Sequence, residues 1–167
     1  MANEELNESP AKRFWFALHI RTNQEYSVDQ ALSQKGYTTY LPDLTEYREY
    51  GNRRKCFRVP CFRGYLFCKL ECTQRLNVSK TQHVYRIVGM GMIPEPESEL
   101  NAVRTLINAG LPFESCVYPR IGERIRIGRG PLAGIDGVLL DVKGSQRVVV
   151  SITLLQRSVS AEIARAD

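Results

Sequence analysis

Residues 59–68 decide the fold of this chain, and they read VPCFRGYLFC. The run of aromatic and aliphatic side chains after the glycine predicts a strand over residues 64–70, in which Tyr65 and Phe67 share one face and Leu66 and Cys68 the other. Two distant segments add weight to this strand. Residues 14–18, FWFAL, form an aromatic segment near the start, and residues 128–138, GRGPLAGIDGV, form a glycine-rich turn near the end.

The first part of the chain alternates short strands with helices. A strand over residues 14–20 is followed by a helix with one apolar face. We expect Thr22 or Asn23 to cap this helix, and Gly36 to end it in a left-handed conformation. The further elements predicted here are a strand over 37–41, an exposed loop or mobile hairpin over 43–58, a helix over 74–82, a strand over 85–88 and a helix from about residue 95 to Gly110. The buried stripe of this last helix is expected to consist of Leu100, Val103, Leu106 and Ile107.

The last third of the chain changes to short strands only. Pro112 and Pro119 bracket this change, so residues 111–118 are predicted to be a linker. Beyond the linker, turn glycines separate strand-like segments, which suggests a small β-barrel over residues 119–167. The chain is therefore predicted to be α+β. Its parts are a disordered lead over 1–11, an α+β domain over 12–110, the linker and the barrel.

Composition limits the class of protein. The 167 residues carry 43% hydrophobic side chains, and no stretch approaches the roughly 18 apolar residues of a membrane-spanning helix. The polar, acidic start does not read as a signal peptide, so we expect a cytoplasmic protein with no membrane contact. Five cysteines without a Cys-x-x-Cys pair favour free thiols. We therefore expect no metal site and no cofactor, and the absence of a phosphate-binding loop or a catalytic motif argues against an enzyme.

Positive charge is concentrated in the middle of the chain. The whole chain has a net charge of +5, but residues 48–86 carry ten bases and two acids. Such a basic segment points to a polyanion, with nucleic acid as the leading choice. The alternative is a solvated loop that only keeps the protein soluble. The candidate nucleic-acid-binding residues are Arg48, Arg53, Arg54, Lys55 and Arg58.

Three motifs in this order resemble the NusG family of transcription elongation factors: the aromatic opening strand, Phe-x-Gly-Tyr-x-Phe and Gly-Pro-Leu-x-Gly-x-x-Gly-Val. The resemblance, over residues 13–165, implies an antiparallel sheet flanked by helices, followed by a five-stranded, SH3-like KOW barrel. It also implies a factor that binds RNA polymerase at the β′ clamp helices and bridges toward the β subunit. Such a factor closes the clamp and suppresses pausing or termination. The basic loop would lie near upstream or non-template DNA, and we expect a monomer.

The resemblance assigns the clamp-helix contact to aromatic side chains on two strands. Tyr and Trp suit such an interface because they combine a large apolar area with a polar tip. Arg63 stands where the family generally has proline, which predicts a less rigid turn into the strand. At least two of the six aromatic candidates are expected to be buried packing residues. The candidate polymerase-binding residues are Trp15, Phe16, Tyr40, Phe62, Arg63, Tyr65 and Phe67.

The C-terminal segment resembles a KOW module. The residues that fit its turn are Gly130, Pro131, Gly134 and Gly137. In the family this barrel recruits a ribosomal small-subunit protein or Rho factor through a loop that corresponds here to residues 153–157. The candidate partner-binding residues are Leu154, Leu155 and Arg157, and one of the two leucines is expected to close the barrel core instead.

Two other interpretations remain open. A ribosomal or RNA-binding KOW protein would need an RNA-facing barrel, yet the basic excess lies outside the barrel. A DNA-binding regulator that works without polymerase would need a recognition helix, for which there is no signal. Within the family, the charged middle, Arg63 and the five cysteines favour a specialised paralogue over the housekeeping factor.

Overall fold

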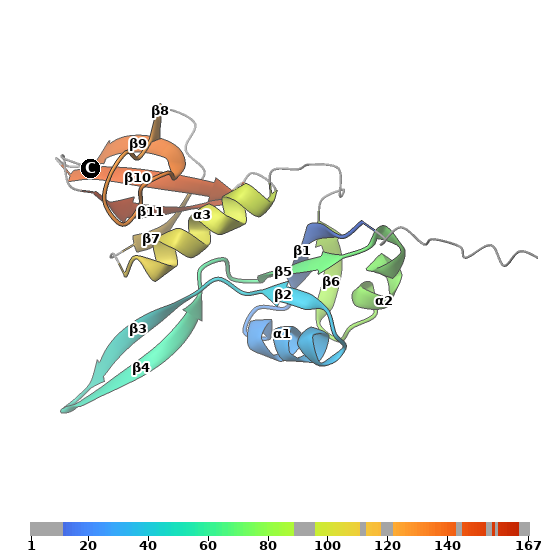
Figure 1. Ribbon diagram of the computed structural model, residues 1–167. Coiled ribbons are helices and arrows are strands. Elements are labelled where there is room, and N and C mark those ends of the chain that lie inside the picture. The colour runs from blue at the N-terminus through green and yellow to red at the C-terminus, as the bar shows by residue number, and fades with distance from the viewer. Residues whose placement is uncertain are drawn as a thin grey trace, which may run out of the picture.

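The structure, a computed structural model, describes residues 12–88, 96–110, 113–117, 122–142, 145–152, 155 and 157–163. This part of the chain forms a four-stranded sheet with helices, a two-stranded hairpin and a five-stranded sheet (Figure 1). The predicted α+β class, with an N-terminal antiparallel sheet and a C-terminal strand-rich sheet, is confirmed. The predicted disordered lead over 1–11 lies outside the described residues.

The N-terminal sheet has the strand order β2-β5-β1-β6, and all its neighbours are antiparallel. Its strands are β1 (Phe14–Ile20), β2 (Thr38–Tyr40), β5 (Tyr65–Leu70) and β6 (Val84–Val88). The helices that follow β1 and β5 are α1 (Glu25–Gln34), η1 (Cys72–Gln74) and α2 (Arg75–Ser79). The helix predicted over 74–82 is thus shorter and begins with a 3₁₀ turn.

Helices α1 and α2 contribute to the core on one face of this sheet. Phe16 and Leu18 of β1 and Leu66 of β5 pack there with Val28 and Leu32 of α1, and all five are fully buried. Because side chains alternate across a strand, the even-numbered residues of β1 belong to this core. The odd-numbered residues of β1 belong to the opposite face.

The ends of α1 test two predictions about helix caps. Neither Thr22 nor Asn23 is the N-cap. The helix begins at Glu25, so Gln24 is the N-cap, and its side chain forms no capping hydrogen bond. Asn23 instead takes a left-handed φ of 66°, which tightens the turn out of β1. Gly36 does follow the helix with a φ of +83°, as predicted.

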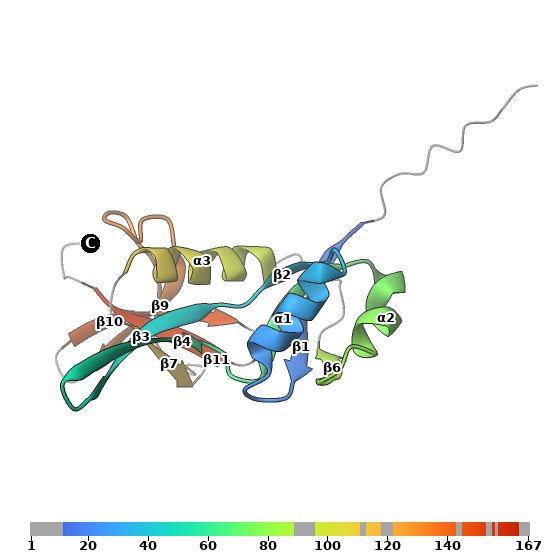
Figure 2. The same cartoon turned by 90° about the horizontal axis from the view of Figure 1, so that it is seen from below.

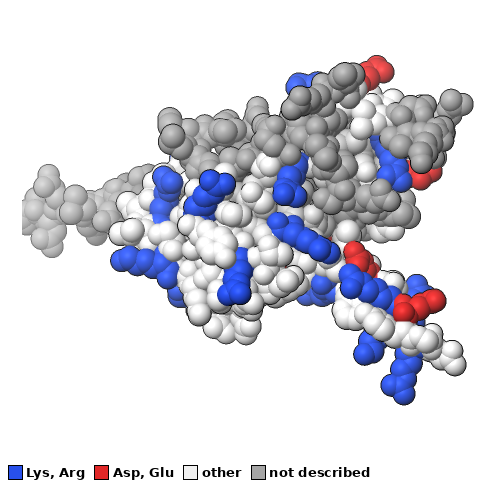
Figure 3. All heavy atoms as spheres, turned by 180° about the vertical axis from the view of Figure 1, so that it is seen from behind, with Lys and Arg blue, Asp and Glu red and all other residues white. Residues whose placement is uncertain are grey.

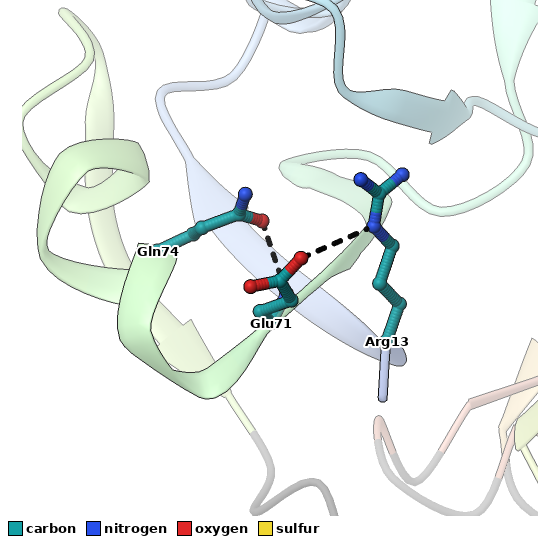
Figure 4. A network of polar contacts seen from close by, with 3 residues as sticks. All are labelled: Arg13, Glu71 and Gln74. Carbon is teal, nitrogen blue, oxygen red and sulfur yellow. Dashed lines mark hydrogen bonds and ion pairs between the residues drawn. The ribbon is translucent and has the colours of Figure 1, made fainter. Parts of the chain in front are cut away.

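A polar network ties the start of β1 to the end of β5 (Figure 4). Arg13 Nε lies 3.5 Å from Glu71 Oε1, and the Glu71 backbone N–H donates to Gln74 Oε1 at 3.1 Å. These contacts extend the antiparallel pairing of Phe14 with Leu70 and begin the 3₁₀ turn. They lie at the end of the β1–β5 pair, whose register is set by the backbone ladder from Phe14–Leu70 to His19–Tyr65.

Strands β3 (Asp43–Tyr50) and β4 (Arg53–Pro60) form a hairpin that projects from the sheet as a separate ribbon (Figure 1). The register pairs Asp43 with Pro60 and Tyr50 with Arg53, so that all eight residues of each strand are paired. Gly51 takes a φ of +58° in the two-residue turn at the tip. The segment predicted as a loop or mobile hairpin is therefore a regular hairpin.

Helix α3 (Pro96–Asn108) connects the N-terminal sheet to the barrel (Figures 1 and 2). Its predicted apolar stripe is confirmed, since Leu100, Val103 and Leu106 are fully buried and Ile107 is partly buried. The stripe belongs to one apolar core that also contains residues of the N-terminal sheet and of the C-terminal sheet. The helix therefore ties the two domains together through packing.

The C-terminal sheet has the order β7-β11-β10-β9-β8. Its strands are β7 (Phe113–Val117), β8 (Glu123–Arg126), β9 (Asp136–Val142), β10 (Ser145–Ile152) and β11 (Arg157–Glu162). The predicted linker over 111–118 was wrong for residues 113–117, because β7 pairs with β11 and belongs to this sheet. The flanking prolines obscured a strand of only five residues.

Candidate interaction surfaces

The face of the N-terminal sheet opposite α1 carries a row of aromatic side chains, called here the aromatic face: Trp15, Tyr40, Tyr65 and Phe67. Register explains the row, because Tyr40 pairs with Phe67 and Phe67 pairs with Ala17 across neighbouring strands. All four aromatic residues belong to the core shared with α3, where Phe67 is fully buried and the other three are partly buried. The predicted alternation of Tyr65 and Phe67 against Leu66 and Cys68 is confirmed.

Three of the six aromatic candidates are buried, which agrees with the expectation of at least two. Phe62 and Phe67 are each 1% exposed, and their rings meet edge to face with centroids 6.2 Å apart. Phe16 is also 1% exposed, but it lies in the core of the other sheet face. Its assignment to the same surface as Trp15 was wrong, because neighbouring residues in a strand point to opposite faces.

Tyr65 stands where the two domains meet. Its ring centroid lies 5.2 Å from that of His19, and the His19 ring also lies 5.7 Å from the tilted ring of the exposed Tyr85. The Arg157 guanidinium of the barrel lies over the Tyr65 ring, 5.8 Å from the centroid. A predicted residue of the aromatic face and a predicted residue of the barrel loop thus contact each other. The barrel thus lies against the Tyr65 end of the aromatic face, an arrangement called docked below.

Charged side chains from α3 and from β5 cover the other end of the aromatic face. Lys69 Nζ lies 5.8 Å above the Trp15 ring and 3.2 Å from Glu97 Oε1 at the start of α3. The Arg104 guanidinium lies 4.5 Å above the Tyr40 ring, and burial raises the pKa of Tyr40 to about 12. The indole N–H of Trp15 is buried, and it has no hydrogen-bond partner in the described part of the chain. Leaving such a donor unpaired is costly.

The turn that presents Tyr65 is held by a residue that sequence reasoning missed. The Phe62 carbonyl accepts the Tyr65 N–H at 3.0 Å, and Gly64 takes a φ of +78° between them, as a type II turn requires. The Gly64 N–H donates to the Glu25 carboxylate at 2.8 Å, and Glu25 is only 3% exposed. Arg63 occupies the turn position that favours proline and is itself exposed. Glu25 therefore holds this turn through a buried hydrogen bond.

In the barrel, the KOW-type turn has the predicted backbone. Gly130 and Gly134 have φ values of +80° and +84°, and the exposed Pro131 lies between them. A Cβ atom on Gly137 would lie 2.7 Å from Val148 Cγ2 and 2.9 Å from the Val149 carbonyl oxygen. Glycine at this position allows β9 and β10 to approach each other closely.

The predicted partner-binding loop of the barrel is only partly described. Leu155 is buried in the shared core, so it is the leucine that packs inside, while Leu154 lies outside the described residues. Arg157 is exposed but already lies over Tyr65. A partner that binds Arg157 would therefore compete with the docked arrangement.

The base of the hairpin is anchored on α1. The Tyr26 hydroxyl donates to Asp43 Oδ2 at 3.0 Å, and Arg58 Nη2 lies 2.7 Å from the same oxygen. Burial and this hydrogen bond raise the pKa of Tyr26, and the bond to Asp43 raises the pKa of Arg58. Arg58, predicted to bind nucleic acid, is thus already engaged in positioning the hairpin. The other four candidates, Arg48, Arg53, Arg54 and Lys55, are exposed on the projecting ribbon.

Positive charge also gathers on the body beside the hairpin, where Lys and Arg outnumber Asp and Glu (Figure 3). Arg21, Arg63 and Arg86 are all exposed near one end of the N-terminal sheet. Backbone hydrogen bonds from Ile20 to Gly64 and from Arg21 to His83 bring these segments together. Sequence reasoning counted Arg63 and Arg86 in the basic middle but did not group them with Arg21. What groups the three arginines is the pairing of β1 with both β5 and β6, which places the ends of these strands side by side.

Three further features of the described residues concern metal binding, the cysteine thiols and helix length. No group of three or more His, Cys, Asp and Glu side chains gathers there as a metal site. Burial raises the pKa of the Cys61 and Cys68 thiols to about 12, whereas Cys56 and Cys72 are exposed. None of the described helices is both long and apolar enough to cross a bilayer.

Comparison with known proteins finds one family. Residues 13–104 match the family model described as "NusG: Transcription termination factor nusG". The chain is 25% identical to a protein of Deinococcus radiodurans and 27% identical to one of Buchnera aphidicola, both called "Transcription termination/antitermination protein NusG". These alignments cover 89% of this chain and 94% of the first relative, and 95% and 96% for the second. The solved structure titled "Domain interaction in Thermotoga maritima NusG" is 17% identical, with a TM-score of 0.49 over 91% of this chain and 93% of that one.

Proposed function

The chain belongs to the NusG family of transcription termination and antitermination factors, and we propose on this premise that its aromatic face binds RNA polymerase at the β′ clamp helices. The observation that carries this proposal is the row of aromatic side chains on one sheet face, with Tyr65 at the meeting point of the domains. Such side chains supply the large contact area of an interface hot spot. The function is mechanical and involves no catalysis.

The docked barrel must leave the aromatic face before polymerase can bind. Arg157 lies over Tyr65, and the barrel shares its core with α3 and Phe67. Polymerase and barrel thus compete for one surface. The apparent association constant for polymerase is therefore the intrinsic constant multiplied by the fraction of molecules that are undocked. The unpaired Trp15 N–H supports this exchange, because a partner that supplies an acceptor would satisfy it.

Once bound, the N-terminal domain would bridge from the clamp helices toward the β subunit and hold the clamp closed. This disfavours paused and backtracked states. The hairpin and the nearby Arg21, Arg63 and Arg86 add a basic surface that suits contact with upstream or non-template DNA. The anchor formed by Tyr26, Asp43 and Arg58 orients the ribbon for such a contact.

The released barrel would recruit a second partner, a ribosomal small-subunit protein or Rho factor, through the loop that contains Arg157. Because Arg157 is engaged on Tyr65 in the docked arrangement, both ligands prefer the undocked arrangement. Binding of polymerase and binding of the partner therefore favour each other, and this coupling is reciprocal.

The test is affinity of the full chain for an isolated clamp-helix fragment, measured by calorimetry. Tyr65→Ala should weaken binding, because loss of an aromatic anchor costs about 1–3 kcal/mol. This exceeds the gain of about 0.5–1 kcal/mol from the lost cation–π contact that favours docking. Arg157→Ala should strengthen binding, because a cation–π contact of about 0.5–1 kcal/mol no longer favours docking. Tyr47→Ala in the hairpin and Arg129→Ala in the barrel turn are matched controls, since both side chains are exposed away from the aromatic face.

Unchanged affinity for Tyr65→Ala would contradict the assignment of the surface. Weaker binding of Arg157→Ala would contradict the competition between barrel and polymerase. Both variants must retain the cooperative urea unfolding of the wild type, followed by the fluorescence of Trp15, which is the only tryptophan of the sequence.

A further inference from the structure

We propose that one face of the β3–β4 hairpin binds single-stranded nucleic acid by stacking unpaired bases on Tyr50, with neighbouring cations holding the phosphates. The inference deepens the nucleic-acid contact proposed above for the hairpin and rests on it. It adds the chemical class of the ligand, which charge alone does not specify.

Register divides the hairpin into two unlike faces. Residues directly opposite each other in an antiparallel pair share a face, and so do residues two apart along a strand. The pairing of Tyr50 with Arg53 and of Arg48 with Lys55 therefore defines one face, called here the stacking face. Its residues are Glu46, Arg48, Tyr50, Arg53, Lys55 and Phe57. The opposite face carries Thr45, Tyr47, Glu49, Arg54, Cys56 and Arg58.

The stacking face arranges aromatic rings and cations in contact. The ring centroids of Tyr50 and Phe57 lie 6.3 Å apart. Lys55 Nζ lies 5.7 Å from the Tyr50 centroid, and the Arg48 guanidinium lies 5.4 Å from the Phe57 centroid. Tyr50 is 55% exposed, so much of its surface is free for a base. Aromatic platforms beside cations are the usual means of binding single strands without sequence preference.

The charges on this face favour a phosphate backbone. Arg48, Arg53 and Lys55 provide three cations, and the only acid on the face, Glu46, is paired with Arg48 at 3.0 Å. On the opposite face, Arg58 is bonded to Asp43 and Arg54 stands directly across from Glu49. The stacking face therefore has the larger number of rings and of uncommitted cations.

Stacking on an exposed tyrosine requires unpaired bases, whereas a duplex would be bound by charge alone. Duplex phosphates are reached by cations, whereas the bases of a duplex are stacked on each other and offer no free ring face. Tyr47 is the internal comparison, because it is 59% exposed and also lies under a cation, Arg54 at 4.2 Å, but on the opposite face. The two tyrosines differ mainly in the face that they occupy.

The experiment measures binding of the full chain to fluorescein-labelled oligothymidylate, oligouridylate and a short DNA duplex by anisotropy, without polymerase. Tyr50→Ala should weaken binding to single strands about tenfold, since stacking on one ring contributes about 1–3 kcal/mol per base. Tyr50→Trp should retain binding, and Tyr47→Ala should leave it unchanged. Lys55→Ser should weaken binding more than Arg54→Ser, although both remove one charge.

Preference for oligothymidylate would identify DNA as the source of the bases, and preference for oligouridylate would identify RNA. Equal losses for Tyr50→Ala and Tyr47→Ala would overturn the proposal, as would an equal loss of duplex binding in Tyr50→Ala. Absence of binding to both single strands would also overturn it. Because no polymerase is present, none of these outcomes depends on the clamp-helix contact, which the Tyr65 variants test separately.

Discussion

Replacing Glu25 with alanine should destabilise the N-terminal domain and loosen the turn that presents Tyr65. The Glu25 carboxylate is 3% exposed and accepts the Gly64 N–H at 2.8 Å. Alanine removes the acceptor and leaves that N–H buried. Glutamine keeps an acceptor of similar reach without the charge, so Glu25→Gln should lie between alanine and the wild type.

The magnitude follows from the kind of bond that alanine removes. A hydrogen bond to a charged group contributes about 1.5–3 kcal/mol. Glu25 is also in the first turn of α1, where a carboxylate contributes about 0.3–1 kcal/mol through the helix dipole. We therefore expect Glu25→Ala to lower the free energy of unfolding by about 2–3 kcal/mol, with the two effects partly overlapping.

Glu97→Ala is the matched control, because Glu97 is in the first turn of α3 but is exposed and pairs with the Lys69 side chain. This substitution should lower the free energy of unfolding by at most about 1 kcal/mol. Urea unfolding followed by Trp15 fluorescence reports this domain, since the barrel contains no tryptophan. If Glu25→Ala and Glu97→Ala have the same unfolding free energy, the bond to Gly64 does not hold the turn.

Three further predictions follow from the turn, the hairpin and the thiols. Arg63→Pro should raise the free energy of unfolding by about 0.4–1 kcal/mol in the same urea assay, because proline suits that turn position; destabilisation would contradict the type II geometry. Replacing Arg53, Arg54 and Lys55 together with serine should flatten the salt dependence of binding to the elongation complex, by about 0.7–0.9 in logarithmic slope for each phosphate that is no longer neutralised. Coincident slopes would mean that these bases are only solvated on the hairpin and do not contact phosphates. Burial raises the pKa of Cys61 and Cys68 from 9.0 to about 12, so their stabilisation is complete below pH 9 and is lost as the pH rises toward 12. Alkylation near neutral pH should modify Cys56 and Cys72 first, and early modification of Cys68 would refute its burial.

Alternation along the strands made much of the fold predictable. It placed Tyr65 and Phe67 on one face of β5 and Leu66 and Cys68 on the other, as the two cores confirm. The same rule separates Phe16 from Trp15, although the two aromatic residues are adjacent in sequence. Strand β7 was missed because it is short and lies between prolines, and only its pairing with β11 identifies it.

The site was less predictable because its contacts join distant parts of the chain. Arg157 and Tyr65 belong to different domains, and no local pattern indicates that their side chains meet. Glu25 looked like an ordinary acid at a helix start, yet its partner is the backbone of Gly64 in another strand turn. Periodicity reports which face a residue occupies, but not which distant group lies against it.

The projecting hairpin also has consequences for self-association. Its two eight-residue strands pair only with each other in the described sheets, so each presents an outer edge of backbone donors and acceptors to solvent. Such edges are templates for pairing with another copy of the chain, and natural proteins protect them with charge. Arg48, Arg53, Arg54 and Lys55 stand on this ribbon, where mutual repulsion between copies opposes edge-to-edge pairing. The bases proposed to bind a polyanion thus also oppose edge-to-edge pairing between copies of the chain.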